Sequence, residues 1–442
     1  MSGILQRTFN FFDNIESKIA FYPTIIAIFG FLLSLLMLFL EKQGISNYLV
    51  ENFPIAVLGQ GNTALTIFSA LITGLISMMV FSFSMVMILL NQASSNYSPR
   101  LLPGLISNKT HQIILGIYLA TIIYNIFIAF TLHPEVENFS IPGFSVLLGI
   151  FLSLLCICAF IYFIHNISQN IQISNILIQI FNTAKQRLLF LMETGPDGNM
   201  DFPSTEDWRE YIAPTSGYLQ NVNYNNLMII SEDIGTKIHV LQIKGSFVLD
   251  QDPLFRSEKE LDKKSLKRIL TNFNFAREEL IGDNYALAFK QITEIIVKAM
   301  SPAINDPGTA VNGIDYMTEL FSLRIQKEDI SVLGKDGKAY VKFNTFTFQE
   351  LIYSVMAPIR AYCKHDVILV KKLMFMFLHL KKGPVKTEKY IEVIQIEAES
   401  LLRDAMEAIK NPRDLEQVYL LAKKLDCDKE LLGSLKTGIA SV

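Results

Sequence analysis

The chain has 442 residues, of which 39 are basic and 42 acidic, so its formal net charge is −3. This balance gives no electrostatic indication of nucleic-acid binding, which needs a clustered basic surface, and we expect no nucleic-acid partner. Only 13 of the charged residues lie in the chain up to Met192. We therefore expect the first part to be a membrane domain and the second part to be a soluble domain.

Residues 1–18 form the first recognisable segment, in which Ile4, Phe9, Phe12 and Ile15 recur at helical spacing among polar residues. The pattern predicts an amphipathic helix that lies at the membrane interface. An ordinary helix packed on a soluble domain would show the same spacing, so both interpretations stay open.

Four uncharged segments follow, and together they predict a four-helix transmembrane domain over residues 19–165. At a rise of about 1.5 Å per residue, each segment is long enough for a helix to cross the roughly 30 Å hydrocarbon core. The four segments are residues 19–40, 62–90, 110–132 and 142–164.

The basic residues that flank these segments predict the orientation of the chain. They gather before the first segment, between the second and third, and after the fourth, whereas the other two loops contain only Lys42 beside several glutamates. The positive-inside rule then predicts that both termini and the whole C-terminal part lie in the cytoplasm. The flanking basic residues on that side are Arg7, Lys18, Arg100, Lys109, Lys185 and Arg187.

The second span has a polar face. No charged residue lies between Glu51 and Arg100, and the hydroxyl and amide residues recur at steps of three, four and seven, which places them on one side of a helix. These residues are Thr66, Ser69, Thr73, Ser77, Ser84 and Asn91. We interpret the face as a candidate pore lining for ions or small solutes. Small residues at this spacing also allow close helix packing, which is the structural alternative.

Polar residues continue to the end of this span, where Gln92, Asn96 and Arg100 would form the cytoplasmic mouth of a pore. The alternative is a simple helix end, because Pro99 stops the helix and Arg100 anchors the topology. No ionisable side chain lies inside the span, so a proton relay would lack its usual intramembrane group. The pattern therefore favours a passive channel over a coupled carrier.

After the fourth span the pattern predicts a stalk, a linker and a cytoplasmic α+β domain. Apolar residues at helical spacing predict an amphipathic stalk helix over 166–193, and glycines and prolines predict an irregular linker over 194–216. Strand-forming residues predict a small β-module over 217–256. Residues 257–442 are predicted to be mostly helical, with a hairpin near 330–345.

A polar corner interrupts the helical pattern at residues 301–310. Asp306 followed by Pro307 is a typical start of a helix, so we expect a tight turn in which Asn305, Asp306 and Thr309 have a structural role. The same three side chains could instead bind a cation or another ligand. The chain contains no catalytic motif and no metal-ligand spacing, so we expect no catalytic residues, no cofactor and no metal.

Five short motifs occur here in the order found in predicted bacterial membrane proteins that carry the domain of unknown function 2254. They are Gln92-Ala-Ser-Ser-Asn-Tyr-Ser-Pro-Arg100, Ile161-Tyr-Phe-Ile-His165, Gly217-Tyr-Leu-Gln220, Gly245-Ser-Phe-Val248 and Ser301-Pro-Ala-Ile-Asn-Asp-Pro307. The chain resembles this family, although Ala303 stands where the family often has glycine, so the corner does not require a residue without Cβ. The resemblance implies a location in the bacterial inner membrane and implies no reaction or substrate.

The sequence as a whole predicts a mainly α membrane protein with four transmembrane helices and a cytoplasmic α+β domain. A four-helix protomer does not easily enclose a pore, so a conduit along the second helix needs a ring of subunits, and we expect a homo-oligomer in the lipid bilayer. The alternative is a non-conducting membrane-anchored sensor or assembly scaffold whose soluble part binds partners. The direction in which the second helix presents its polar face distinguishes the two functions.

Overall fold

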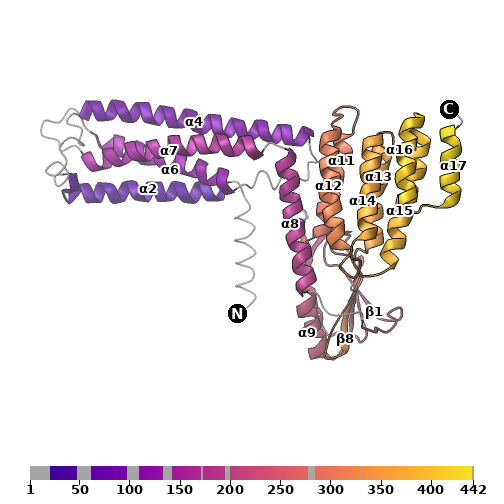
Figure 1. The fold of residues 1–442 in the computed structure, drawn as a ribbon. Helices are drawn as coiled ribbons and strands as arrows, with labels where there is room; N and C mark the ends of the chain where they lie inside the picture. Colours follow the sequence, from indigo (N-terminus) through magenta and orange to yellow (C-terminus); the bar gives the residue numbers. More distant parts are fainter. Residues whose placement is uncertain are drawn as a thin grey trace. The chain divides into compact units, whose positions relative to one another are not determined.

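The computed structural model divides into two compact units, Met1–Gln172 and Ile173–Val442. Figure 1 shows the elements of each unit. The structure describes residues 20–46, 61–96, 109–132, 142–170, 173–194, 200–276, 284–329 and 331–440. The interfacial helix predicted over residues 1–18 lies outside the described residues, as do Arg100 and the side chains of Gln92 and Asn96.

The first unit contains four long helices within its described residues. They are α2 (Phe21–Lys42), α4 (Gly61–Asn96), α6 (Lys109–Thr131) and α7 (Gly143–Asn170). All four are long and apolar enough to cross a membrane, as the absence of charge predicts. Helix α6 packs against each of the other three, and α2 and α4 lie on opposite sides of α6 and α7 (Figure 1).

Large side chains fill the interior of this bundle. Phe68 on α4, Tyr118 and Tyr124 on α6 and Phe163 on α7 are fully buried. Helices α2 and α6 approach closely at Gly30, because a Cβ built on Gly30 would lie 2.6 Å from the Cα of Ala120. The absence of a side chain at this position therefore sets the distance between two candidate spans.

Glu41 joins the end of α2 to the start of α7. Its Oε1 accepts hydrogen bonds from the backbone N–H of Ser145 at 2.9 Å and from the Ser145 hydroxyl at 2.8 Å. Its Oε2 accepts a hydrogen bond from Ser46 Oγ at 2.6 Å, and Ser46 Oγ accepts one from the Phe144 N–H at 3.0 Å. A carboxylate at a helix N-terminus satisfies backbone donors that have no partner inside the helix.

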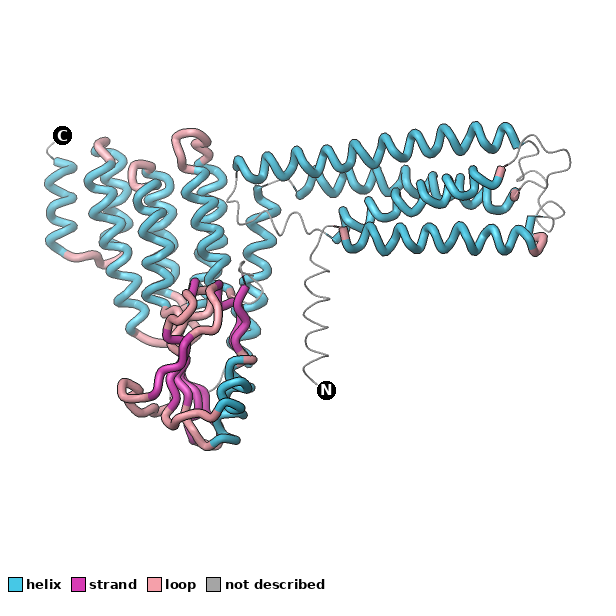
Figure 2. Tube along the Cα trace, turned by 180° about the vertical axis from the view of Figure 1, so that it is seen from behind, coloured by secondary structure: helices cyan, strands magenta, loops and turns pink. Residues whose placement is uncertain are grey.

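The second unit combines a helical layer with two sheets, whose strands gather at one end of the helices (Figure 2). Its helices are α8 (Ile173–Thr194), α9 (Tyr224–Ile234), α10 (Lys263–Leu270), α11 (Tyr285–Ala299), α12 (Pro307–Arg324), α13 (Phe348–Cys363), α14 (Val367–Lys382), α15 (Lys389–Ala408), α16 (Pro412–Lys424) and α17 (Lys429–Ala440). Its strands are β1 (Arg209–Ile212), β2 (Gly217–Val222), β3 (Ile238–Val240), β4 (Phe247–Val248), β5 (Pro253–Ser257), β6 (Phe273–Ala276), β7 (Val332–Lys335) and β8 (Lys338–Phe343). This α+β arrangement is the predicted fold class.

The strands form a five-stranded sheet of order β1-β5-β3-β8-β7 and a three-stranded sheet of order β4-β2-β6. The hairpin expected near 330–345 is β7 and β8, and β8 pairs in parallel with β3. The larger sheet therefore unites strands that lie far apart in the sequence. Residues 209–212 were expected in an irregular linker but form β1, because Tyr211 stacks on Phe255 of the paired strand at 4.9 Å.

Helix α8 packs its apolar side on its own unit. The buried residues follow the three-and-four spacing expected of an amphipathic helix, and α8 contacts α11 and α12. Its buried apolar residues are Ile176, Leu177, Ile180, Phe181, Ala184 and Leu188.

A chain of aromatic rings ties the helical layer together. Phe289 on α11 lies 4.6 Å from Phe321 on α12, and Phe348 at the start of α13 lies 6.1 Å from Phe321 and 4.7 Å from Tyr390 on α15, measured between ring centroids. Such contacts add to the burial of apolar area. They hold four helices in one core.

Candidate functional site

The polar face of α4 points away from the bundle to which α4 belongs. Residues Ala64, Phe68, Leu75 and Ser82 are buried and recur at steps of four and seven, so they define the inner face of the helix. At about 100° per residue, the predicted pore-lining residues are centred on the opposite side. Thr66, Ser69, Thr73, Ser77, Ser84 and Asn91 are all exposed in the protomer.

The hydroxyl groups of this face bond to their own helix. Thr66, Thr73, Ser77 and Ser84 each donate a hydrogen bond to the carbonyl oxygen four residues earlier, at 2.8 to 2.9 Å. Each hydroxyl proton is therefore occupied, while the oxygen keeps a lone pair that points outward. The face can rest against an apolar neighbour or accept hydrogen bonds from water.

Small residues lie beside the hydroxyl groups. Ala70 and Gly74 are exposed, and a Cβ built on Gly74 would meet no heavy atom within 4 Å. A helix surface without bulky side chains allows a second helix to approach its backbone closely. The outer face of α4 thus combines outward oxygen atoms with room for another helix.

The predicted cytoplasmic mouth is described only in its backbone. Helix α4 continues through Gln92 to Asn96, so the first two mouth residues extend the same helix. The arrangement of the Gln92 and Asn96 side chains and of Arg100 lies outside the described residues.

The polar corner before α12 is a capped helix start. Asp306 Oδ1 accepts the backbone N–H of Thr309 at 3.1 Å, and Asp306 Oδ2 accepts the Thr309 hydroxyl at 2.5 Å. Asn305 has a φ of 47°, in the left-handed region that Asn tolerates better than most residues. The predicted capping by Asp306 is confirmed, and it engages both carboxylate oxygens. Among the described residues, no group of three or more His, Cys, Asp and Glu is placed to hold a metal ion.

The structure also shows a line of buried polar groups that the sequence analysis missed, on the inner side of α6. Asn125 Nδ2 donates to Ser153 Oγ on α7 at 3.0 Å, and His111 Nε2 lies 3.1 Å from Asn166 Oδ1 on α7. Asn125 Oδ1 and the Tyr118 hydroxyl are buried and have no hydrogen-bond partner within the described part of the chain. The available signal was the seven-residue spacing of His111, Tyr118 and Asn125 along the third span.

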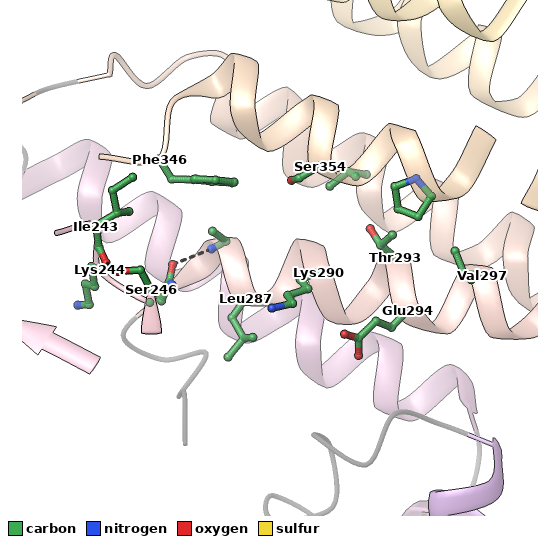
Figure 3. Close-up of a pocket in the computed structure, with 15 residues that line it drawn as sticks. Ile243, Lys244, Ser246, Leu287, Lys290, Thr293, Glu294, Val297, Phe346 and Ser354 are labelled. Carbon is green, nitrogen blue, oxygen red and sulfur yellow. Dashed lines mark hydrogen bonds between the residues drawn. The ribbon is translucent and has the colours of Figure 1, made fainter. Parts of the chain in front are cut away.

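A cavity of about 530 Å³ lies within the second unit, between α11 and α13 (Figure 3). One side of α11 forms its floor, because Ala286, Lys290, Thr293 and Val297 recur at steps of three and four. Residues 243–246 line another side, and Phe346 and Ser354 lie across from α11. The cavity was not predicted, because its walls come from segments that are distant in the sequence.

Comparison with known proteins assigns the chain to a family. The model of a family described as "Predicted membrane protein (DUF2254)" matches residues 16–379. The chain belongs to this family. The resemblance inferred from the five motifs is thereby confirmed, and the matched range contains the four candidate spans, the capped corner and the cavity.

The chain is also similar to uncharacterized proteins of Mycobacterium bovis and Mycobacterium tuberculosis. Each is 22% identical to it over 325 residues, which cover 70% of this chain and 62% of the relative. The match therefore spans less than two thirds of these relatives' own length. No solved structure gives a significant match to the chain.

Proposed function

We propose that the chain forms an oligomeric channel or channel-like conduit for ions or small solutes, with α4 lining the path. The observation that carries this proposal is the direction of the polar face of α4. Its six polar residues are exposed on the side opposite the buried residues of the same helix. A face directed away from the protomer's own core is available to meet the same face of neighbouring copies.

The packing of the bundle supports a path between protomers over one through a protomer. Fully buried aromatic side chains from α4, α6 and α7 occupy the interior. They are Phe68, Tyr118, Tyr124 and Phe163. A homo-oligomer in which each copy contributes one α4 would enclose the polar face without opening this core.

The polar face of α4 offers uncharged oxygen atoms, which would coordinate an ion or a small polar solute weakly. Four of its five hydroxyl groups give their protons to backbone carbonyl groups, so these four present oxygen lone pairs outward. Such oxygens replace part of the hydration shell of a cation or hydrate a small polar solute. No charged residue lies on the described part of α4, so the proposed transport is passive.

The proposed location is the bacterial inner (plasma) membrane, with both termini in the cytoplasm. The family membership supports a membrane protein, and the distribution of basic residues around the spans supports the orientation. In this orientation the second unit is cytoplasmic and regulates the conduit. The proposal involves no catalysis, no cofactor and no nucleic acid.

A second candidate is a non-conducting membrane-anchored sensor or assembly scaffold. The observation that favours it is that four of the five hydroxyl groups on the polar face of α4 satisfy their protons within the helix, so these groups can contact lipid or protein without water. The cavity in the second unit gives such a sensor a place for a ligand.

Ion flux through the purified protein in liposomes separates the two candidates. Ser77→Trp places a large ring on the polar face, and we expect it to abolish flux. Phe83→Trp is the matched control, because Phe83 is 55% exposed beside that face and already carries a ring, so flux should persist. Absence of wild-type flux under varied pH, voltage and osmotic tension would favour the sensor or scaffold.

Thiol labelling tests the lining independently of flux. In a Cys158→Ser background, chosen because Cys158 is exposed on α7, we expect Ser84→Cys to react with a small polar thiol reagent. Phe83→Cys should stay unreactive, because lipid excludes the reagent. Equal protection of both positions would argue against a water-filled path.

A further inference from the structure

The cavity between α11 and α13 has the size of a small-molecule site. Its volume of about 530 Å³ lies within the range of roughly 300–1,000 Å³ typical of ligand pockets. Such pockets usually combine apolar walls with a few polar groups that orient the ligand. The composition of this wall therefore indicates what it would bind.

Most of the wall is apolar. Leu287 and Val297 come from α11, Val355 and Pro358 come from α13, and Phe346 lies just before α13. Together these side chains favour a ligand with an aliphatic or aromatic body. A fully polar ligand would lose hydration here without recovering hydrogen bonds.

The hydroxyl protons in the wall are already engaged. Ser246 Oγ donates to the carbonyl of Ile243 at 2.7 Å, Thr293 Oγ1 to the carbonyl of Phe289 at 2.8 Å, and Ser354 Oγ to the carbonyl of Leu351 at 2.8 Å. These hydroxyl groups can accept a hydrogen bond from a ligand, but they do not donate one without breaking a bond that the protein already has.

The available donors belong to Lys290 and Asn284. Within the described part of the chain, the Lys290 ammonium makes no hydrogen bond or ion pair. Asn284 uses its Oδ1 to accept the Ala286 N–H at 3.1 Å, and its Nδ2–H groups make no hydrogen bond within the described part of the chain. Lys244, the other lysine of the wall, donates to Asn221 Oδ1 at 3.0 Å. The wall thus offers one cationic donor, Lys290, and one neutral donor, Asn284.

Glu294 adds a negative charge to the cavity wall that contains the positive charge of Lys290. It lies one turn after Lys290 on the same side of α11 and also lines the cavity (Figure 3). A carboxylate on a ligand is attracted by Lys290 and repelled by Glu294. A molecule with one anionic end and an apolar body fits this arrangement better than a molecule with an anion at each end.

We propose that this cavity binds a small amphipathic monoanion, a carboxylate whose apolar body contacts the α13 side and whose charge is held by Lys290 and Asn284. The bound molecule touches residues 243–246, α11 and α13 at once, and so joins the sheet region to the helical layer. Helix α11 also packs on α8, the helix that follows the fourth span in the chain. The proposal stands whether or not the membrane helices conduct.

Calorimetric titration of the full chain in lipid nanodiscs tests the site with two soluble probes. 1-Naphthylacetate carries the required charge, and 1-naphthylacetamide is its neutral counterpart of nearly equal shape. We expect the wild-type protein to bind the acetate roughly tenfold or more tightly than the amide, as a hydrogen bond to a charged group implies. Heat measured with empty nanodiscs is subtracted, so partition of the probes into lipid is counted separately.

Three variants locate the binding. Lys290→Gln should remove the preference for the acetate, whereas Lys264→Gln, on the exposed side of α10, should keep it. Val297→Trp should fill the cavity and abolish binding of both probes. Far-UV circular dichroism during thermal unfolding checks that each variant unfolds like the wild type, because Val297→Trp and Ser354→Trp add a second tryptophan to Trp208. If Val297→Trp fails this check, Ser354→Trp, at an exposed wall position, replaces it.

The proposal is overturned if the wild type binds neither probe above the nanodisc background or binds the acetate and the amide equally. It is also overturned if Lys290→Gln retains the wild-type preference, or if a folded, cavity-filled variant binds as the wild type does. These outcomes are distinct from any result of the flux measurement, because the cavity variants change residues of the second unit and calorimetry does not measure conduction.

Discussion

The two units bury polar groups in opposite ways. In the first unit, large apolar side chains face outward, with Phe130 82% and Ile161 66% exposed, while neutral polar groups such as Asn125 lie inside. In the second unit, apolar rings fill the core, and buried polar groups include charged pairs such as Arg360 with Glu397. The surface of the first unit suits lipid, and that of the second unit suits water. The partner that a buried polar group needs therefore differs between the two units.

Because of this difference, different kinds of substitution should destabilise the two units. In the second unit a charge that loses its partner has no solvent to replace it, so single changes in a buried pair should be costly. In the first unit most described polar groups are neutral, so tight packing matters more than pairing. Three predictions test this contrast, in order of decreasing effect.

The largest effect is expected from breaking the buried ion pair of the second unit. Arg360 on α13 pairs with Glu397 on α15 and donates from Nε to Asp404 Oδ2 at 3.1 Å. Burial raises the pKa of Glu397, and Arg360 opposes that rise. Arg360→Met should lower the free energy of unfolding by about 3–5 kcal/mol, because it leaves a buried carboxylate without its partner. Chemical denaturation followed by Trp208 fluorescence measures the loss.

An exposed pair provides the control. Arg268 lies 2.8 Å from Asp233, and both side chains are largely exposed, so Arg268→Met should cost less than about 1 kcal/mol. The double variant Arg360→Met/Glu397→Leu should recover much of the loss, because both charges are then gone. Equal effects of Arg360→Met and Arg268→Met would refute the role assigned to burial.

The next effect is steric and belongs to the first unit. A Cβ built on Gly149 of α7 would lie 2.6 Å from Phe68 Cε1 and 2.7 Å from Asn125 Oδ1. Gly149→Ala should therefore destabilise the bundle by about 1–3 kcal/mol through overpacking. Gly74→Ala is the matched control, because its Cβ meets open space, and it should leave stability unchanged or raise it slightly. Thermal unfolding in detergent compares the two variants, and equal midpoints would contradict the packing described for α7.

The smallest effect is the pH dependence of the sheet region. His239 on β3 is buried, with Nδ1 2.7 Å from Thr205 Oγ1 and Nε2 3.2 Å from Asn344 Oδ1. Burial lowers its pKa below the usual 6.5, the hydrogen bond with Asn344 raises it, and the charges of Lys342 and Arg256 lower it further. The unfolded chain therefore takes up this proton first as the pH falls.

The sign of the pH effect follows from this order. The contribution of neutral His239 to stability is present above pH 6.5 and is lost as the pH falls from 6.5 through its lower folded pKa. His239→Gln should flatten the profile of unfolding midpoint against pH, measured with the fluorescence of Trp208. An unchanged profile in His239→Gln would show that His239 does not cause the pH dependence of stability.

Local chemistry allowed part of the fold to be predicted from the sequence. Four uncharged segments predicted the four candidate membrane-spanning helices, and Asp306 before Pro307 predicted the capped start of α12. Both signals act over short distances along the chain, so no knowledge of neighbouring segments is needed. The pairing of β3 with β8 and the strand at 209–212 depend on contacts between distant segments, which a local pattern does not encode.

The candidate sites show the same limit more sharply. Spacing placed the polar residues of α4 on one face, but the direction of that face depends on where α6 and α7 pack. Asn125 is a single amide within an apolar run, and only its contact with Ser153 shows that it points inward. The cavity depends on three segments at once, and only Gly245 and Ser246 belonged to a motif noted in the sequence.

The carboxylate of Glu41 makes the assembly of the bundle depend on its last helix. It sits at the end of the first described span, yet the donors it needs, the N–H and hydroxyl of Ser145, belong to the start of the fourth. Because Ser145 is synthesised after the first three candidate spans, until then Ser46 and water are the donors available to this carboxylate. The hydrogen bonds that link the end of α2 to the start of α7 can therefore form only after the fourth candidate span has been synthesised.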